Sequence, residues 1–242
     1  MIPKIIHYCW FGRNPIPENL RNHMQSWRKI MPYWEFREWN EDNYSIEDAP
    51  LYVRQAYEAK KYAFVSDYVR LLALEQYGGV YLDTDVEVVK SFEPLLNDTA
   101  FMGLEESLAH LPGTCVMGSE PHSAWVTAML QTYNNATFIK QDGSYDLTTN
   151  VRRMGNEICK HGFIPSRKEQ YITEWGLRIY THDYFSPITS TRVMRRTNNT
   201  YAIHYLESSW SGKKKSIIPK VKLYYEFVNI LVQIKRKLKG VN

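Results

Sequence analysis

The chain has 242 residues, of which 44% are hydrophobic and 14% aromatic, and its net charge is +4. This composition excludes a disordered chain, and the length suits a single α/β catalytic domain. No run of 18 apolar residues predicts a membrane span, and no apolar signal-peptide core follows Met1. Cys9, Cys115 and Cys159 are scattered without metal-ligand spacing, so we expect reduced thiols and a cytoplasmic protein.

The first third of the chain alternates strand and helix patterns. After an N-terminal strand, a helix is predicted over Pro17–Ile30, where Leu20, Met24 and Trp27 are spaced for one core-facing side. The β-rich stretch Tyr33–Trp39 predicts a second strand. This order is typical of the nucleotide-binding halves of α/β domains.

A second helix is expected to end at Gly78 and Gly79, a strong stop signal, with Ser66 as its predicted N-cap and a strand from Val80. Asp67 and Arg70 are three residues apart and so lie on one face of this helix. Their simplest interpretation is an ion pair within the helix. Its apolar spacing comes from Phe64, Tyr68, Leu71 and Leu72.

Two carboxylates one residue apart, Asp83 and Asp85, interrupt a β-branched run. Asp is a poor strand residue, and side chains at i and i+2 of an extended segment lie on the same side. Both carboxylates can therefore reach one hard cation such as Mg²⁺ or Mn²⁺, with a diphosphate completing its shell. A charged turn at a strand edge is the plain alternative. An EF-hand is excluded, because Val88 and Pro94 occupy the positions of its Gly and Glu.

The last 30 residues form a strongly basic tail. Residues 213–242 carry nine Lys and Arg against one Glu, so residues 1–212 sum to −4. Between the basic clusters, Glu226, Asn229 and Gln233 define one narrow polar stripe on an otherwise apolar helix. Such a helix can lie on an anionic membrane surface, or it can dock on the protein's own core. Because the body is acidic, nucleic-acid binding is not expected.

Three ordered blocks resemble glycosyltransferase family 32, which includes yeast-type mannosyltransferases and many bacterial polysaccharide enzymes. The central block is Ser66–Arg70 together with Gly78–Asp85, the region that carries the DXD motif. The opening block is Ile2–Gly12 and the closing block is Ala202–Trp210. The glucosylating domains of clostridial toxins are more distant relatives, with a different late Asn-x-Ser-x-Trp arrangement.

The resemblance implies a role for each matching residue. Asp67, Arg70, Asp83 and Asp85 would form the catalytic set. Trp10 would stack on the nucleotide base. Asp67 and Arg70 would bind the donor sugar and the diphosphate, and Asp83 would bind the ribose or the sugar hydroxyls. Asp85, with Asp83 and His204, would hold the metal. Ser209 and Trp210 would contact the β-phosphate and close the site. A core Trp and a structural His are the plain alternatives for Trp10 and His204.

The resemblance also implies a GT-A type fold, one Rossmann-like α/β domain over residues 1–212 with a mixed, mostly parallel sheet and the site at the carboxyl ends of its strands. We expect a retaining, Mn²⁺- or Mg²⁺-dependent hexosyltransferase that uses a UDP-sugar and attacks by the front face. Its acceptor would be a glycan or lipid-linked oligosaccharide of surface or capsular polysaccharide, reached from the inner face of the cell membrane through the tail 213–242.

Elements later in the chain are candidates to contact the acceptor. Phe101–Glu106 predicts a strand in which Glu105 or Glu106 faces the acceptor, and Ser123–Tyr133 predicts a helix. Within Gln141–Arg153, Asp142, Asp146 and Asn150 are candidates to line the cleft. Two alternatives remain open: a metal-dependent phosphodiesterase or nuclease, and a non-catalytic sugar-nucleotide binding module. No GxGxxG or P-loop pattern is present.

Overall fold

A computed structural model describes residues 1–105, 110–189 and 191–207. The predictions for Glu106, Ser209, Trp210 and the basic tail 213–242 fall outside these ranges. No helix in the described ranges is both long enough and apolar enough to cross a bilayer.

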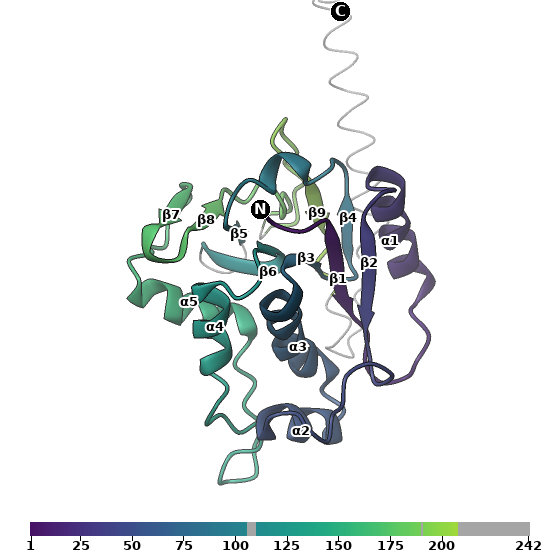
Figure 1. The fold of residues 1–242 in the computed structure, drawn as a ribbon, viewed down its shortest axis with the longest axis vertical. Coiled ribbons are helices and arrows are strands. Elements are labelled where there is room, and N and C mark those ends of the chain that lie inside the picture. The colour runs from purple at the N-terminus through teal and green to yellow at the C-terminus, as the bar shows by residue number, and fades with distance from the viewer. Residues whose placement is uncertain (106–109, 190, 208–242) are drawn as a thin grey trace, which may run out of the picture.

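Helices and strands alternate at the start of the chain, the strands β3 to β6 follow one another after α3, and two helices and three short strands come after them (Figure 1). Their bounds are β1 (Ile5–Cys9), α1 (Glu18–Ile30), β2 (Glu35–Trp39), α2 (Leu51–Glu58), α3 (Tyr62–Tyr77), β3 (Gly79–Leu82), β4 (Val86–Val88), β5 (Ala100–Glu105), β6 (Leu111–Ser119), α4 (Ala124–Gln131), α5 (Asn150–Lys160), β7 (Gln170–Ile172), β8 (Leu177–Tyr180) and β9 (Ala202–His204). The helices and strands predicted within 17–39, 101–105 and 123–133 are confirmed, with ends shifted by one or two residues.

The main sheet has seven strands in the order β2-β1-β3-β6-β5-β8-β7. β2, β1, β3, β5 and β8 run in one direction, whereas β6 and β7 are antiparallel to their neighbours. The predicted α/β class and the mixed, mostly parallel sheet are therefore confirmed. Since the parallel strands share a direction, their carboxyl ends meet at one edge, where ligands bind in open α/β sheets.

Two hydrophobic clusters cover the two faces of this sheet. Helices α2, α3, α4 and α5 pack on one face, and α1 packs on the other with a two-stranded sheet of β4 and β9. In Figure 1, α1 and β4 lie together, apart from the group formed by α3, α4 and α5. Strand β3 serves both clusters, because Val80 and Leu82 face the α1 side and Tyr81 faces the other.

The predicted N-cap at Ser66 is wrong. Helix α3 begins at Tyr62, and Ser66 lies inside it, where its hydroxyl donates to the Tyr62 carbonyl at 3.1 Å. The reason is packing: Phe64 and Val65 are buried, so the apolar face of the helix extends upstream of the serine. A Ser hydroxyl that bonds back along the helix is a common position for this residue type.

Gly78 and Gly79 join α3 to β3 in backbone conformations that favour glycine. Their φ angles are +61° and +99°, and a Cβ on Gly79 would lie 2.7 Å from the Ile5 carbonyl oxygen. The Gly78 carbonyl accepts a hydrogen bond from His7 Nε2 at 2.8 Å, while Trp39 Nε1 donates to His7 Nδ1 at 3.1 Å. These partners fix a neutral imidazole, and burial lowers the pKa of His7 to about 4.

We predict that Gly79→Ala destabilises the protein more than Gly162→Ala. Gly162 also has a positive φ, +92°, but a Cβ there meets nothing within 4 Å. The Gly162 variant should lose about 1 to 2 kcal/mol of unfolding free energy from backbone strain alone. The Gly79 variant should lose about 3 kcal/mol or more, because it adds a clash with the Ile5 backbone. Urea unfolding measures both, and equal losses would contradict this account of the α3–β3 junction.

Candidate functional site

The residues that the sequence singles out gather at the carboxyl edge of the sheet. Trp10 directly follows β1, Asp83 directly follows β3, and Glu105 is the last residue of β5. Helix α3 carries Asp67 and Arg70 beside this edge. The site is thus assembled at one edge of the sheet from elements that are distant in the sequence.

Arg70 is the centre of the first group of contacts. Its side chain is 6% exposed, and its guanidinium reaches Asp67 Oδ1 at 3.0 Å and Asp83 Oδ1 at 3.2 Å. The helical pair predicted from the spacing therefore forms, but Arg70 also connects α3 to the end of β3. A guanidinium is suited to this role because its five N–H groups form a rigid fork.

Neighbouring groups hold the guanidinium in place. Arg70 Nη1 donates to the Thr114 carbonyl at 2.9 Å, and Nε donates to the Ser66 carbonyl at 3.2 Å. The ring of Tyr81 lies under it, 4.5 Å from the guanidinium carbon, and the Tyr81 hydroxyl donates to Asp83 Oδ1 at 3.0 Å. Thr114 is 44 residues from Arg70 in the sequence, so only the folding of the chain brings the two residues together.

Asp67 is held from its other side by the start of α5. The Asn150 backbone N–H donates to Asp67 Oδ2, and the Asn150 side-chain amide donates to the Asp67 carbonyl, both at 3.3 Å. Burial raises the pKa of Asp67 to about 6, although Arg70 opposes that shift. Of the three candidates in 141–153, Asn150 thus lies beside Asp67. Asp146 pairs with Arg153 at 3.0 Å, and Asp142 is exposed in a turn with Ser144.

The segment from Asp83 to Asp85 is not extended. The prediction that these two side chains share one side of an extended strand is therefore wrong. Strand β3 ends at Leu82 and β4 begins at Val86, and the Val86 N–H donates to the Asp83 carbonyl across a turn at 3.1 Å. The physical reason is that β4 leaves the main sheet to pair with β9.

Pairing of β4 with β9 brings the late histidine to this turn. Val86 lies opposite His204 in the ladder, and His204 Nε2 lies 3.4 Å from Asp85 Oδ1. The candidate ligand atoms of Asp83, Asp85 and His204 all lie within 4.8 Å of one another. Two carboxylates and an imidazole at this separation are a suitable donor set for a divalent cation.

The residues after His204 fix the other side of Asp85. The Glu207 backbone N–H donates to Asp85 Oδ2 at 2.9 Å, and the Tyr205 N–H donates to the Asp85 carbonyl at 3.1 Å. Glu207 in turn accepts hydrogen bonds from Asn19 and His23 of α1. Sequence reasoning missed this role of Glu207, because no motif joins a backbone N–H to a distant carboxylate.

Trp10 follows β1 with a partly exposed side chain. Its indole N–H donates to the Asn14 carbonyl at 2.6 Å, which fixes the plane of the ring at the end of the strand. The other two predicted donor contacts, Ser209 and Trp210, lie beyond the described residues.

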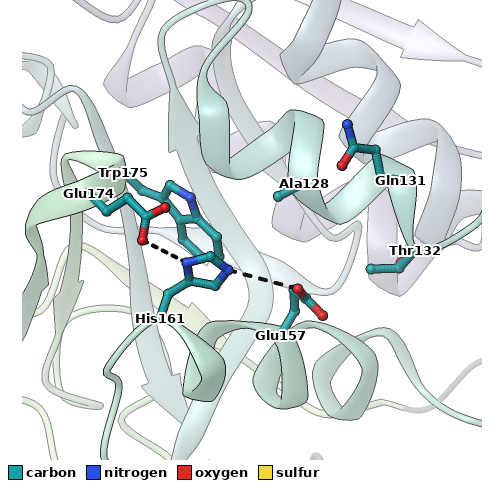
Figure 2. A pocket seen from close by; sticks show the side chains of 7 residues that line it. All are labelled: Ala128, Gln131, Thr132, Glu157, His161, Glu174 and Trp175. Carbon is teal, nitrogen blue, oxygen red and sulfur yellow. Dashed lines mark hydrogen bonds and ion pairs between the residues drawn. The ribbon is translucent and has the colours of Figure 1, made fainter.

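A pocket of about 440 Å³ lies elsewhere, between α4, α5 and the turn before β8 (Figure 2). In it, His161 lies against Trp175, with ring centroids 4.0 Å apart, and contacts Glu174 at 2.8 Å and Glu157 at 3.9 Å. None of the predicted site residues lines this pocket. The predicted site residues therefore lie at the carboxyl edge and not in this pocket.

Comparisons with known proteins identify the central block. Residues 17–102 match the family model described as glycosyltransferase sugar-binding region containing DXD motif, a range that includes Asp67, Arg70, Asp83 and Asp85. Inositol phosphoceramide mannosyltransferase 3 of Schizosaccharomyces pombe is 34% identical over 42% of this chain and 29% of its own length. Mannosyl phosphorylinositol ceramide synthase SUR1 of Saccharomyces cerevisiae is 30% identical over 57% of this chain and 37% of its own length.

The chain thus spans about a third of the length of these curated relatives. Among solved structures, the PaToxG glycosyltransferase is 19% identical, with a TM-score of 0.49 over 66% of this chain and 72% of its own. The resemblance stated from the sequence is confirmed by this match, which covers residues 17–102.

Proposed function

We propose that this chain is a metal-dependent, retaining glycosyltransferase that takes a hexose from a nucleotide-diphosphate sugar, with a UDP-sugar as donor. The observation that carries the proposal is the convergence of Arg70 and the Asp83–Asp85 turn with His204 at the carboxyl edge of the sheet. This edge offers a guanidinium for phosphate oxygens beside a donor set for a cation.

The donor would lie across this edge. Asp67 and Arg70 would bind the sugar and diphosphate, Asp83 the ribose or sugar hydroxyls, and Trp10 the base. The position of Trp10, between the ends of β1 and β2, supports this order, because its backbone N–H donates to the Trp39 carbonyl at 2.9 Å. Ser209 and Trp210 would complete the diphosphate contacts.

The residues present fit a divalent metal. Asp83, Asp85 and His204 offer hard oxygen atoms and one imidazole within 4.8 Å of one another, which suits Mn²⁺ or Mg²⁺. When bound, such a cation neutralises charge on the departing diphosphate. The Glu207 N–H and the Arg70 guanidinium each engage one carboxylate of this set, and so keep the two side chains aimed at the same place.

For the reaction, we propose front-face attack with retention of configuration. The bond from the anomeric carbon to the diphosphate oxygen breaks, the acceptor oxygen bonds to that carbon on the same face, and the acceptor proton passes to the departing oxygen. Arg70 would stabilise the negative charge of the departing diphosphate, because its buried guanidinium holds a fixed orientation.

The acceptor would be a glycan or a lipid-linked oligosaccharide of a surface polysaccharide. One yeast relative is named as an inositol phosphoceramide mannosyltransferase and the other as a mannosyl phosphorylinositol ceramide synthase. Both names contain a ceramide lipid, which supports an acceptor with a lipid part. We propose that the basic tail 213–242 holds the enzyme at the anionic inner face of a membrane, where such acceptors lie.

A panel of nucleotide sugars incubated with the protein and Mn²⁺ tests this function. We expect one donor to be hydrolysed slowly to nucleoside diphosphate, with loss of the reaction on adding a chelator. Release of nucleoside monophosphate would instead indicate a phosphodiesterase. Metal-dependent binding of a donor without turnover, even with acceptors present, would indicate a binding module.

We predict that Asp85→Asn lowers kcat by about 100-fold or more, or about 3 kcal/mol of transition-state stabilisation, because it removes a metal-binding carboxylate. The matched control is Asp48→Asn, since Asp48 is an exposed aspartate before α2. Donor hydrolysis measured at saturating Mn²⁺ compares the two variants. Near-normal turnover by the Asp85 variant would contradict its assignment to the metal.

We also predict that the metal-free protein loses stability as pH rises above about 6.5, the pKa of an unperturbed histidine. Burial alone would lower the pKa of His204, but Asp85 beside it raises that pKa well above the ordinary value. The folded chain therefore keeps a proton that the unfolded chain releases, and this stabilisation disappears as pH rises through the folded pKa. Added Mn²⁺ should restore stability at high pH, because a metal-bound imidazole is unprotonated.

Thermal unfolding in chelator between about pH 6 and pH 9 measures this effect. In His204→Gln, stability should fall less with rising pH than in the wild type, because the titrating imidazole is absent. His122→Gln, at an exposed histidine, should show the wild-type fall. Identical pH dependence in the wild type and the His204 variant would show that the Asp85–His204 pair is not charged.

A further inference from the structure

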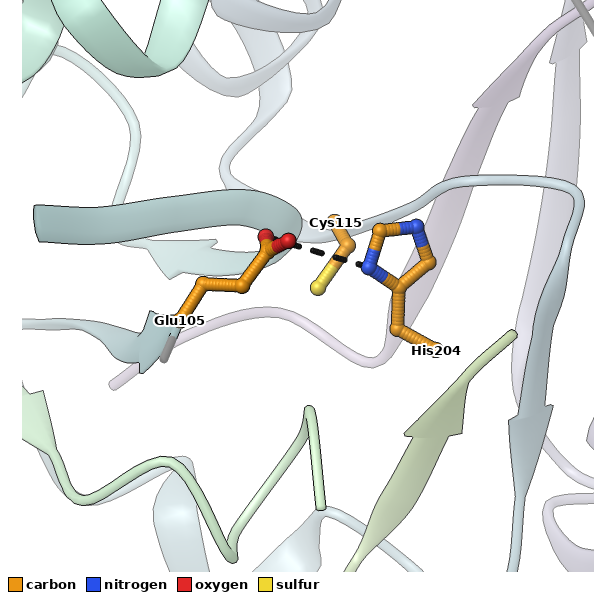
Figure 3. A group of neighbouring side chains, drawn as sticks. All are labelled: Glu105, Cys115 and His204. Carbon is orange, nitrogen blue, oxygen red and sulfur yellow. Dashed lines mark ion pairs between the residues drawn. The ribbon is translucent and has the colours of Figure 1, made fainter. Parts of the chain in front are cut away.

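A second group of side chains that can bind a metal ion lies beside His204, on the side of its Nδ1 atom (Figure 3). Cys115 of β6 and Glu105 of β5 face the imidazole from two different strands, and the candidate ligand atoms of the three residues lie within 4.8 Å of one another. His204 Nδ1 lies 3.9 Å from Glu105 Oε2. No local sequence pattern indicates this group, because its members are at positions 105, 115 and 204.

This group is buried. Glu105 and Cys115 are each 4% exposed. Nδ1 of His204 is also buried, and it has no hydrogen-bond partner of ordinary geometry in residues 1–105, 110–189 and 191–207. A buried polar nitrogen without such a partner costs free energy, and the sulfur and carboxylate beside it are the groups that a shared cation would join.

The backbone is shaped to put Cys115 there. The pairing of β5 with β6 shifts register between Met102 and Gly103, which are paired with Met117 and Gly113. Residues 114–116 thus bulge out of that ladder at the carboxyl edge, and bulges beside active sites redirect side chains. Gly113 leaves room for the carboxylate, since a Cβ there would lie 3.0 Å from Glu105 Oε2.

We propose that Glu105, Cys115 and His204 form a second metal site, selective for Zn²⁺ and similar thiophilic divalent ions, whose occupancy opposes metal binding at Asp83 and Asp85. A thiolate, an imidazole and a carboxylate are the usual ligands of zinc, and three protein ligands leave a fourth position open. Mg²⁺ and Mn²⁺ prefer oxygen and bind a buried thiolate poorly.

The opposition follows from sharing one imidazole, and this part rests on the proposed function. His204 directs Nε2 toward Asp85 and Nδ1 toward the Glu105 side. A neutral imidazole has one nitrogen with a free lone pair. Zinc on Nδ1 therefore leaves the proton on Nε2, which then donates to Asp85 instead of binding the catalytic metal. Zn²⁺ would thus inhibit from a site that the donor does not occupy.

Cobalt spectroscopy tests the site without any reaction. Co²⁺ added to the full chain should give the near-ultraviolet charge-transfer absorption of a thiolate ligand, and one equivalent of Zn²⁺ should remove it. Cys115→Ser should abolish the absorption, whereas Cys159→Ser, at a partly buried cysteine of α5, should keep it. No charge-transfer band in the wild type, or an unchanged band in the Cys115 variant, would overturn the proposal.

Zinc affinity gives a second measure, by competition with a chromophoric chelator. Loss of an outer-shell partner commonly costs about 10- to 100-fold in metal affinity, so Cys115→Ser should weaken Zn²⁺ binding by more than about 100-fold. Should that variant fail to fold, as judged by circular dichroism, Glu105→Gln replaces it and should weaken Zn²⁺ binding by at least about tenfold. Unchanged zinc affinity in the folded variant would contradict the site.

Electron paramagnetic resonance of Mn²⁺ separates this proposal from the proposed function. Zn²⁺ should displace bound Mn²⁺ from the wild type but not from Cys115→Ser. Displacement from both proteins would mean that zinc binds at Asp83 and Asp85, and would overturn the second site. A cobalt–thiolate band in a protein that binds no Mn²⁺ would leave the second site standing and reject the catalytic metal.

Discussion

The buried guanidinium of Arg70 is the interaction on which the rest of the site depends. A charge that is 6% exposed is tolerated only when it is paired and hydrogen-bonded, and Arg70 meets that condition through Asp67, Asp83 and Thr114. These partners come from α3, the end of β3 and the bulge of β6. One cation therefore fixes the relative position of three elements at the edge where the donor would bind.

The charge balance of this group explains why a further cation would be needed. Arg70 is already matched by Asp67 and Asp83, and His204 is matched by Asp85. Three carboxylates thus face two cations, and the group keeps a net negative charge. A diphosphate brought to such a site gains little from Arg70 alone. A divalent ion between the Asp83–Asp85 turn and the diphosphate would supply the missing positive charge. The same imidazole, through its other nitrogen, would make that ion's binding sensitive to zinc.

Much of the fold could be predicted from the sequence, because long apolar periodicities and the Gly78–Gly79 stop are local signals. The local spacing of Asp67 with Arg70 and of Asp83 with Asp85 singled out these residues, and the family resemblance supplied their predicted roles. What local patterns could not give was the path of the chain after Leu82: β4 leaves the main sheet, and its pairing with β9 is what brings His204 to Asp85. The contacts of Thr114, Cys115 and Glu207 are equally non-local, since they depend on a bulge and on backbone groups that carry no sequence signature.

In the proposed function, a divalent cation binds at Asp83, Asp85 and His204 together with a nucleoside diphosphate. Anomalous diffraction from crystals of the protein grown with Mn²⁺ and UDP would locate that cation. We expect a manganese peak contacting the three side chains, with diphosphate oxygens completing its shell next to Arg70. A manganese peak elsewhere, or a bound diphosphate with no metal at the Asp83–Asp85 turn, would contradict it.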